Sequence, residues 1–161
     1  MNFEIDVAEK MDVDDNELRK LLFDVYVNGG YINPSDADKV LNPANVRDRG
    51  IIFAARSKQS CVLAGISVWV PYGRRAIRFA KSNEVEFQLL AVKYEYRGLG
   101  LGTQLVKKMI NMSKEKKYSK VILWTQVSMQ KAQHIYTKLG FLPRDEFEKN
   151  NRKFTMYELQ L

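Results

Sequence analysis

An apolar segment that leads into a basic, glycine-rich turn constrains this chain most. Residues 89–103 read LLAVKYEYRGLGLGT, which predicts a strand, a turn and the start of a helix. Glycines without a Cβ allow successive backbone N–H groups to converge on one point. The first turn of a helix adds unpaired N–H donors and partial positive charge. The segment therefore predicts an anion site made of backbone, and a diphosphate suits it.

Three established nucleotide-binding motifs each match this turn only in part or not at all. Gly98 and Gly100 satisfy the dinucleotide fingerprint G-x-G-x-x-G, but its third position is Thr103 and the turn lies far from an opening βαβ unit. A P-loop requires Gly-Lys-Ser/Thr, a tripeptide that the sequence lacks. A methyltransferase-type G-x-G-x-G turn would have an acidic residue where this chain has Tyr96. The residues around the turn must therefore identify its ligand.

Two blocks of sequence resemble the GNAT acetyltransferase superfamily. The pattern R-x-x-G-x-G at residues 97–102, preceded by Leu-Ala-Val, is similar to its motif A. The pattern A-x-x-x-Y-x-K-x-G-F at residues 132–141 is similar to the helix and strand that end its conserved core. The two blocks stand in the expected order and lie within residues 84–142, about a third of the chain. The alternative is a glycine turn that binds no ligand.

The length of 161 residues predicts a single domain over residues 1–161. Hydrophobic periodicity predicts strands near residues 3–7, 51–55, 62–70, 83–92, 121–124, 141–142 and 154–161. It predicts helices from Asp14 or Asp15, and at residues 34–41, 102–117 and 129–139. The resemblance implies an α/β fold with the order βααβββαβαββ. Its mixed, twisted sheet of six to seven strands would carry about four helices on its two faces.

Cysteine content and hydropathy predict a cytoplasmic protein. Cys61 is the only cysteine, so an intramolecular disulfide is excluded, and we expect it to be an inert core or edge residue. Residues 1–6 carry acids where a signal peptide would carry basic residues. No apolar run approaches the ~20 residues of a membrane span, so we expect no membrane partner.

Charge is distributed unevenly along the chain. Residues 1–50 hold six basic and eleven acidic residues, whereas the remainder holds twenty basic and eight acidic ones, giving +7 overall. The basic part contains the predicted phosphate-binding turn, where a positive field would help to capture CoA. We do not predict nucleic-acid binding, because the basic residues are not interleaved with aromatic ones that would stack on bases. Residues 144–152 are expected to be a charged loop, either mobile or at the edge of a substrate site.

Acetyl transfer to an amine requires a base for the amine and an acid for the leaving thiolate. Glu86 is the predicted base, directly or through water, because the family pattern often has an acid at this position before Leu-Ala-Val. Strand alternation would place Glu84, the second choice, on the same face, opposite Val85, Phe87, Leu89 and Ala91. A structural alternative remains open, in which Glu86 pairs with an arginine or is solvated.

Tyr136 is the predicted acid, by its match to the tyrosine of the second block. Its alternative role is in the core, because it shares a helical stripe with Ala132, Ile135 and Leu139. His134, the only histidine, lies off that stripe and is expected to be exposed.

The resemblance implies acetyl-CoA as cosubstrate, with its pantetheine arm beside a strand that splays from its neighbour. The residues implied to bind it are Leu90, Ala91, Val92, Arg97, Gly98, Leu99, Gly100, Leu101, Gly102 and Thr103. Backbone N–H groups at residues 90–92 would hold the acyl oxygen. No metal is expected. Many relatives have an asparagine where this chain has Met129, so Ser128 or Gln126 would replace it or the contact is absent.

The leading hypothesis is an acetyl-CoA-dependent N-acetyltransferase that acts on a primary amine of a small molecule or peptide, by direct transfer in a ternary complex. Residues 18–49 would form most of the acceptor pocket, and Asp36 and Asp38 there would suit a cationic amine. The alternative is an acyl-CoA-binding or sensor module without turnover. The oligomeric state stays open, a homodimer included.

Overall fold

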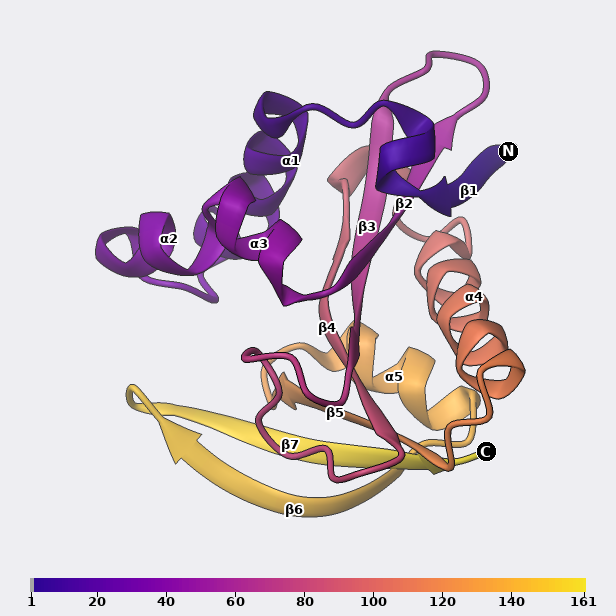
Figure 1. Ribbon diagram of the computed structural model, residues 1–161. Coiled ribbons are helices and arrows are strands. Elements are labelled where there is room, and N and C mark those ends of the chain that lie inside the picture. The colour runs from indigo at the N-terminus through magenta and orange to yellow at the C-terminus, as the bar shows by residue number, and fades with distance from the viewer. Residues whose placement is uncertain (1) are drawn as a thin grey trace.

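Seven strands of the computed structural model, which describes residues 2–161, lie side by side in one sheet (Figure 1). Their order along the sheet is β1-β2-β3-β4-β5-β7-β6. Within the described residues, β4 and β5 form the one parallel pair, and the predicted mixed sheet is confirmed. The strands are β1 (Phe3–Val7), β2 (Ile51–Ser57), β3 (Leu63–Pro71), β4 (Glu84–Val92), β5 (Lys120–Gln126), β6 (Leu142–Lys149) and β7 (Arg152–Gln160).

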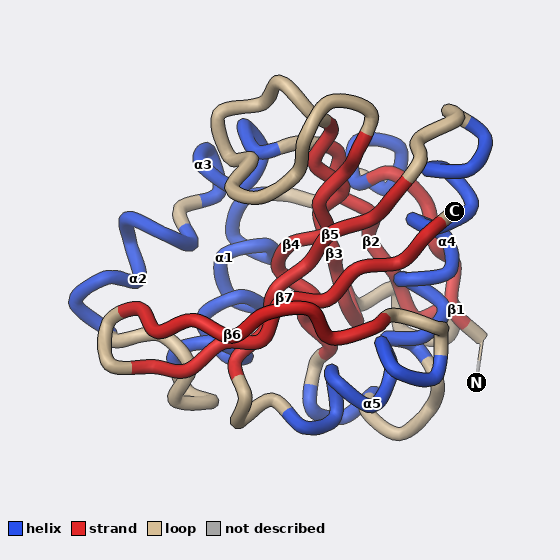
Figure 2. Tube along the Cα trace, turned by 90° about the horizontal axis from the view of Figure 1, so that it is seen from below, coloured by secondary structure: helices blue, strands red, loops and turns tan. Residues whose placement is uncertain are grey.

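Helices cover both faces of the sheet, as the sequence predicts. One face carries α1 (Asp15–Leu22), α2 (Pro34–Leu41) and α3 (Pro43–Arg49). The other carries α4 (Leu101–Glu115) and α5 (Gln130–Lys138). Figure 2, seen from below, shows the strands between these two groups of helices and the long β6–β7 hairpin across them. No helix of the described residues has the length and apolar character that a membrane span requires.

The helix that the sequence analysis missed is α3. Asn42 separates it from α2, because its side chain accepts a hydrogen bond from the Ala44 N–H at 2.9 Å and caps the new helix. Pro43 occupies the first turn, where its missing N–H leaves no bond unmade. The end of α3 places Arg49 at the cavity described below.

Helix α1 begins where the sequence predicts, at an Asp14 cap. The Asp14 carboxylate accepts a bond from the Glu17 N–H at 2.8 Å, and the Glu17 carboxylate accepts one from the Asp14 N–H at 3.2 Å. The helix continues as a π-helical turn over Phe23–Val27, and Gly30 follows with φ 80°. This wider turn positions Tyr26 against the sheet.

Two apolar clusters, one on each face of the sheet, form the core. Leu18, Leu22 and Ile66 are fully buried between the sheet and α1–α3. Leu105 and Met109 are fully buried between the sheet and α4. Burying both faces fixes the central strands in place, and strand β4 belongs to both clusters.

A bulge in β4 corrects the predicted alternation of its side chains. Leu89 has φ 53°, and the register between β3 and β4 shifts between Ile66 and Val68. An extra residue at this point reverses which side chains face each layer. Leu89 and Ala91 therefore pack on the α1–α3 side, while Leu90 and Val92 join Phe87 and Val85 on the α4–α5 side. The prediction that Leu89 and Ala91 share a face with Val85 was wrong.

Two further expectations were wrong. Residues 144–152 form most of β6 and the turn into β7 rather than a loop, because pairing with β7 extends as far as Lys149 and Arg152. Cys61 is exposed in the turn before β3, with φ 58°, instead of lying in the core or at a strand edge.

Candidate functional site

Strands β4 and β5 part midway along the sheet. They pair only between Glu84–Phe87 and Lys120–Leu123. Beyond these residues β4 continues to Val92, whereas β5 stays paired with β7 on its other side. The edge of β4 that faces β5 therefore has no strand partner from Gln88 onward, so this stretch of backbone is open to an extended ligand.

A cavity of about 750 Å³ occupies this opening. Leu90, Val106 and Ala132 line it from the side of α4 and α5, and Tyr26 and Arg49 line it from the side of α1–α3. Two molecules approaching from opposite faces of the sheet would therefore meet between β4 and β5. A volume of this size is typical of small-molecule and cofactor sites.

The glycine-rich turn lies at the C-terminal end of β4 and begins α4. Gly98 and Gly100 have φ of 75° and 79°, values that glycine adopts without strain. The first helical bond in this turn is from the Gln104 N–H to the Gly100 carbonyl at 3.1 Å, so the N–H groups of residues 101–103 precede the helical ladder. No side chain caps this helix end. These backbone donors fit a diphosphate.

Gly102 allows the turn to approach the splayed strand closely. A Cβ at this position would lie 2.9 Å from Ile135 Cδ1, 3.8 Å from Val92 Cγ2 and 3.9 Å from Leu90 Cδ2. The first turn of α4 thus packs where α5 and the outer part of β4 converge. Of the predicted cofactor residues, Leu90 lines the cavity, and Gly102 lies close to Leu90 and Val92. Residues 97–103 form the turn beyond the end of β4, outside the lining of the cavity.

Tyr136 reaches the cavity from α5. Its ring packs against Phe141 and Tyr157, with centroid distances of 5.7 and 6.1 Å. The residue is 7% exposed and lines the cavity. Its hydroxyl makes no hydrogen bond within residues 2–161, and no fully buried side-chain oxygen or nitrogen there lacks a partner, so the hydroxyl keeps some accessible surface. Burial, with a smaller contribution from Tyr157, raises the pKa of Tyr136 well above its ordinary value. The hydroxyl therefore keeps its proton at neutral pH and is free to donate it.

Glu86 is fully buried and lies beside the cavity rather than in its lining. Its Oε1 accepts bonds from the backbone N–H groups of Arg78, at 2.9 Å, Phe79, and Ala80, at 2.8 Å. Its Oε2 accepts a bond from Gln88 Nε2 at 3.0 Å. Both carboxylate oxygens are thus engaged in holding the loop of residues 72–83 and the side chain of Gln88.

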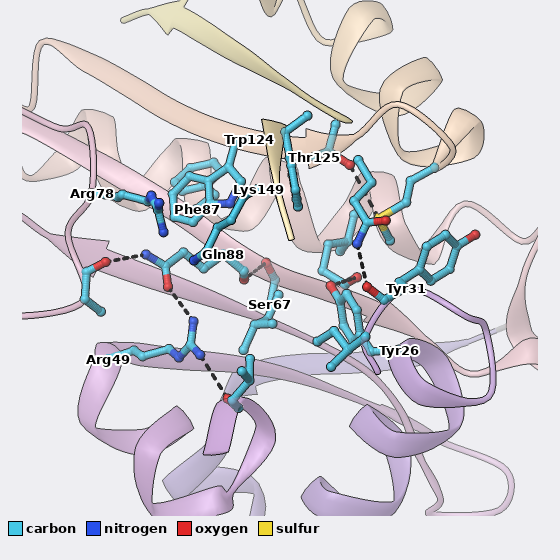
Figure 3. A pocket seen from close by; sticks show the side chains of 18 of the residues that line it. Tyr26, Tyr31, Arg49, Ser67, Arg78, Phe87, Gln88, Trp124, Thr125 and Lys149 are labelled. Atoms are coloured by element: carbon cyan, nitrogen blue, oxygen red, sulfur yellow. Dashed lines mark hydrogen bonds between the residues drawn. The ribbon is translucent and has the colours of Figure 1, made fainter. Parts of the chain in front are cut away.

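Gln88 links Glu86 to Arg49, a cavity residue that the sequence analysis did not single out. Gln88 Nε2 also donates to the Ala76 carbonyl at 3.0 Å, and Gln88 Oε1 accepts from Arg49 Nη1 at 3.0 Å (Figure 3). Arg49 Nη2 donates to the Val40 carbonyl at 2.9 Å. Glu86 and Gln88 are neighbours on β4, but Arg49 and Ala76 come from α3 and from the 72–83 loop, so no local pattern predicts their contacts with Gln88.

Tyr26 lies at the bulge. Its hydroxyl donates to the Leu90 carbonyl at 2.9 Å. Burial, and then the proximity of Tyr136, raises the pKa of Tyr26. Tyr26 belongs to the apolar cluster on the α1–α3 side of the sheet, and Tyr136 belongs to the cluster on the α4–α5 side. Tyr26 therefore fixes the backbone of β4 where the two strands part.

Other predicted residues occupy varied places. His134 is exposed, as expected. Met129 lines the cavity and its sulfur accepts a bond from the Thr125 hydroxyl at 3.6 Å, while Gln126 Nε2 donates to the Tyr31 carbonyl at 2.7 Å. Asp38 pairs with Arg19 at 2.6 Å and does not line the cavity.

Comparisons with known proteins agree with this geometry. The family model described as Acetyltransferase (GNAT) family matches residues 16–141. An uncharacterized N-acetyltransferase of Dictyostelium discoideum is 36% identical over 78 residues, and the match covers 47% of this chain and 36% of that protein. The chain thus spans about a third of the length of that curated relative.

Solved structures share the fold over nearly the whole chain. A putative acetyltransferase from Acinetobacter baylyi has a TM-score of 0.75 at 20% identity, covering 99% of this chain and 93% of that one. An acetyltransferase from Bacillus subtilis, solved in complex with CoA, has a TM-score of 0.69 at 21% identity and covers 99% of both chains. Because the family model matches most of the sequence, the chain belongs to the acetyltransferase (GNAT) family, whose cosubstrate is acetyl-CoA.

Proposed function

We propose that this chain transfers an acetyl group from acetyl-CoA to the primary amine of a small molecule, by direct transfer between two bound reactants. The splay of β4 from β5 carries this proposal, because it opens one cavity to both faces of the sheet. Acetyl-CoA supplies the activated thioester. Holding both reactants in one cavity provides much of the acceleration that such a reaction needs.

The chain's own groups have distinct tasks in this proposal. The N–H groups of Leu101, Gly102 and Thr103 bind the diphosphate at the start of α4. The unpaired edge of β4 from Gln88 to Val92 binds the pantetheine arm, and backbone N–H groups beside the bulge stabilise charge on the acyl oxygen. Tyr26 keeps this backbone in place through the Leu90 carbonyl.

Proton transfers complete the reaction. The acceptor reacts as the neutral amine, after its ammonium form has lost one proton to solvent. Its nitrogen then forms a bond to the acyl carbon as the carbon–sulfur bond breaks. Tyr136 donates its proton to the departing sulfur, and the nitrogen releases its own proton to water in the open cavity. Tyr136 then regains a proton from solvent. The position of Tyr136 in the lining of the cavity supports this role, and its raised pKa means that the hydroxyl carries its proton at neutral pH.

Glu86 has a positioning role in this account, in place of the direct base that its sequence position suggests. Its oxygens already accept four hydrogen bonds, three from backbone and one from Gln88. A carboxylate in this state has little capacity left to take a proton from an amine in the cavity. It fixes the loop that contains Arg78 and, through Gln88, orients Arg49.

Release of CoA tests the proposed activity. We expect the purified chain to release CoA from acetyl-CoA only when an amine acceptor is added. Thiol detection measures the released CoA, and mass spectrometry identifies the acetylated product. A non-catalytic acyl-CoA-binding module would bind acetyl-CoA in a titration and release no CoA with any amine. That result would contradict the proposal.

Gly100→Ala should weaken acetyl-CoA binding by about 10-fold. Alanine at φ 79° strains the turn by roughly 1–2 kcal/mol and turns aside the N–H groups that follow. A Cβ there meets no protein atom within 4 Å, so the effect comes from backbone conformation alone. The matched control is Gly73→Ala, which also has positive φ and open space but lies in the 72–83 loop. Calorimetric titration should show unchanged affinity for the control, and equal losses in both variants would refute a diphosphate site at the turn.

A further inference from the structure

The cavity carries far more positive than negative charge where it opens toward α2, α3 and the 72–83 loop. Its basic lining residues are Lys39, Arg49, Arg75, Arg78, Lys149 and Arg152, and its acidic ones are Asp36 and Asp48. These residues come from α2, α3, the 72–83 loop, β6 and β7, so the fold collects them from distant parts of the sequence. The expectation of an acidic pocket for a cationic amine is therefore not supported.

Most of these basic side chains lack an acidic partner. Arg75 pairs with Asp48 at 3.5 Å. No carboxylate of residues 2–161 lies within ion-pairing distance of the other five. Elsewhere on the chain Arg19, Arg47 and Arg56 each have such a partner. The positive charge in the cavity is therefore left uncompensated by the protein itself.

Arg49 is the most informative of the five. It is half-buried, and its two hydrogen bonds go to neutral oxygens, those of Gln88 and Val40. Burial lowers the pKa of Arg49 from its ordinary value. A guanidinium held away from water is normally paired with an anion. Here Glu86 and Gln88 orient it toward the cavity with donors to spare.

Lys149 lies in the same field. Lys149 is exposed, yet slight desolvation lowers its pKa, and the like charges of Arg78, Arg49 and Lys39 lower it further. Figure 3 shows Arg49, Arg78 and Lys149 grouped around Gln88. An anion bound among these side chains would relieve both their mutual repulsion and their desolvation.

This positive cluster is separate from the predicted diphosphate site. Glu86 anchors the loop bearing Arg78 near the start of β4, whereas the glycine turn follows the end of that strand (Figure 1). The cluster therefore lies beside the first half of β4, as far as Gln88, whereas the turn follows the end of the strand at Val92.

We propose that the acceptor is a small amine that also carries an acidic group, a carboxylate or phosphonate, which the cluster around Arg49 binds. This inference rests on the proposed acetyl transfer and names its substrate class. The acidic group lies against Arg49, Arg78 and Lys149, and the amine points to the opening between β4 and β5. Lysine-rich peptides are disfavoured, because their charge has the same sign as the cavity's.

Matched pairs of amines test this charge preference. At saturating acetyl-CoA, CoA release is measured with glycine and glycinamide, methionine and methioninamide, and phenylalanine and phenylalaninamide. Aminomethylphosphonate and a lysine-rich peptide complete the panel. We expect the acid of at least one pair to exceed its amide by about 10-fold or more in kcat/KM. The phosphonate distinguishes a general anion site from one that requires a carboxylate.

Two variants connect the preference to the cluster. Arg49→Gln and Lys149→Gln should each raise KM for the acid by about 10-fold or more while changing the values for the amide little. Arg74→Gln is the control, because Arg74 is exposed in the same loop and does not line the cavity. Unchanged acetyl-CoA affinity in Arg49→Gln would show that the effect concerns the acceptor.

The outcomes separate this inference from the proposed function. Amides used as well as acids, or a preference for acids that survives both variants, would overturn the inference and leave acetyl transfer intact. If no pair releases CoA, calorimetry compares the affinities of the acids and the amides for the complex of the protein with CoA. Equal affinities, or no binding of either, also overturn the inference. Failure to bind acetyl-CoA at all would instead overturn the proposed function.

Discussion

Tyr136→Phe should lower kcat by about 100-fold while leaving the fold and the affinity for acetyl-CoA unchanged. A positioned general acid contributes roughly 10²–10⁴ in rate, and we assign that contribution to the Tyr136 hydroxyl. The hydroxyl lines the cavity and makes no hydrogen bond among residues 2–161, so its removal takes no partner away from another group of the protein. The aromatic contacts with Phe141 and Tyr157 are retained. Steady-state kinetics, calorimetric titration and thermal unfolding measure the three quantities.

Tyr157→Phe is the matched control. Tyr157 belongs to the same aromatic cluster, but its hydroxyl donates to Gln133 Oε1 at 3.0 Å and the residue does not line the cavity. We expect this variant to lose a little stability and to keep its kcat. A Tyr136→Phe protein with wild-type kcat, or one that loses activity only because it unfolds, would show that Tyr136 is a core residue without a catalytic role.

Glu86→Gln should destabilise the fold by about 3 kcal/mol, since it removes the charge that strengthens four buried hydrogen bonds. For a domain of this size that corresponds to a fall in Tm of roughly 6–12 °C. The introduced amide also presents donors to Gln88 Nε2, itself a donor, which loosens the link to Arg49. In the kinetics, KM for the acceptor should therefore rise more than kcat falls.

Glu84→Gln is the matched control for Glu86→Gln. Glu84 lies two residues away on β4 and accepts a single bond, from the Lys81 N–H at 3.0 Å. The Tm of Glu84→Gln should therefore fall by far less than that of Glu86→Gln. The pH dependence of kcat distinguishes the two roles of Glu86. If Glu86→Gln removed the acidic limb of the kcat profile while Tm stayed constant, Glu86 would be the base and not a positioning residue.

Local sequence chemistry predicts the parts of this fold that depend on neighbouring residues. The glycine turn, the Asp14 cap and the start of α4 follow from residues within one or two turns of each other. The apolar segment 121–124 is central because both of its faces are apolar, and it lies inside the sheet as β5.

The remaining features depend on pairing between distant segments. The bulge at Leu89 arises in the register of β4 against β3, which local alternation does not encode. Strand β6 is mostly exposed and polar, so its periodicity is weak and pairing with β7 alone defines it. Arg49 and Lys149 meet only after α3 and β6 are placed. The positive cluster in the cavity therefore could not be predicted from local sequence.

Binding of acetyl-CoA to the opening between β4 and β5 is the central claim, and thermal unfolding with acetyl-CoA tests it most directly. A ligand at ~100 times its Kd stabilises a protein by about 2.7 kcal/mol. For this chain that predicts a rise in Tm of roughly 5–10 °C with acetyl-CoA, and none with S-adenosylmethionine or NAD. The rise should shrink in Gly100→Ala. No rise at millimolar acetyl-CoA would contradict the account.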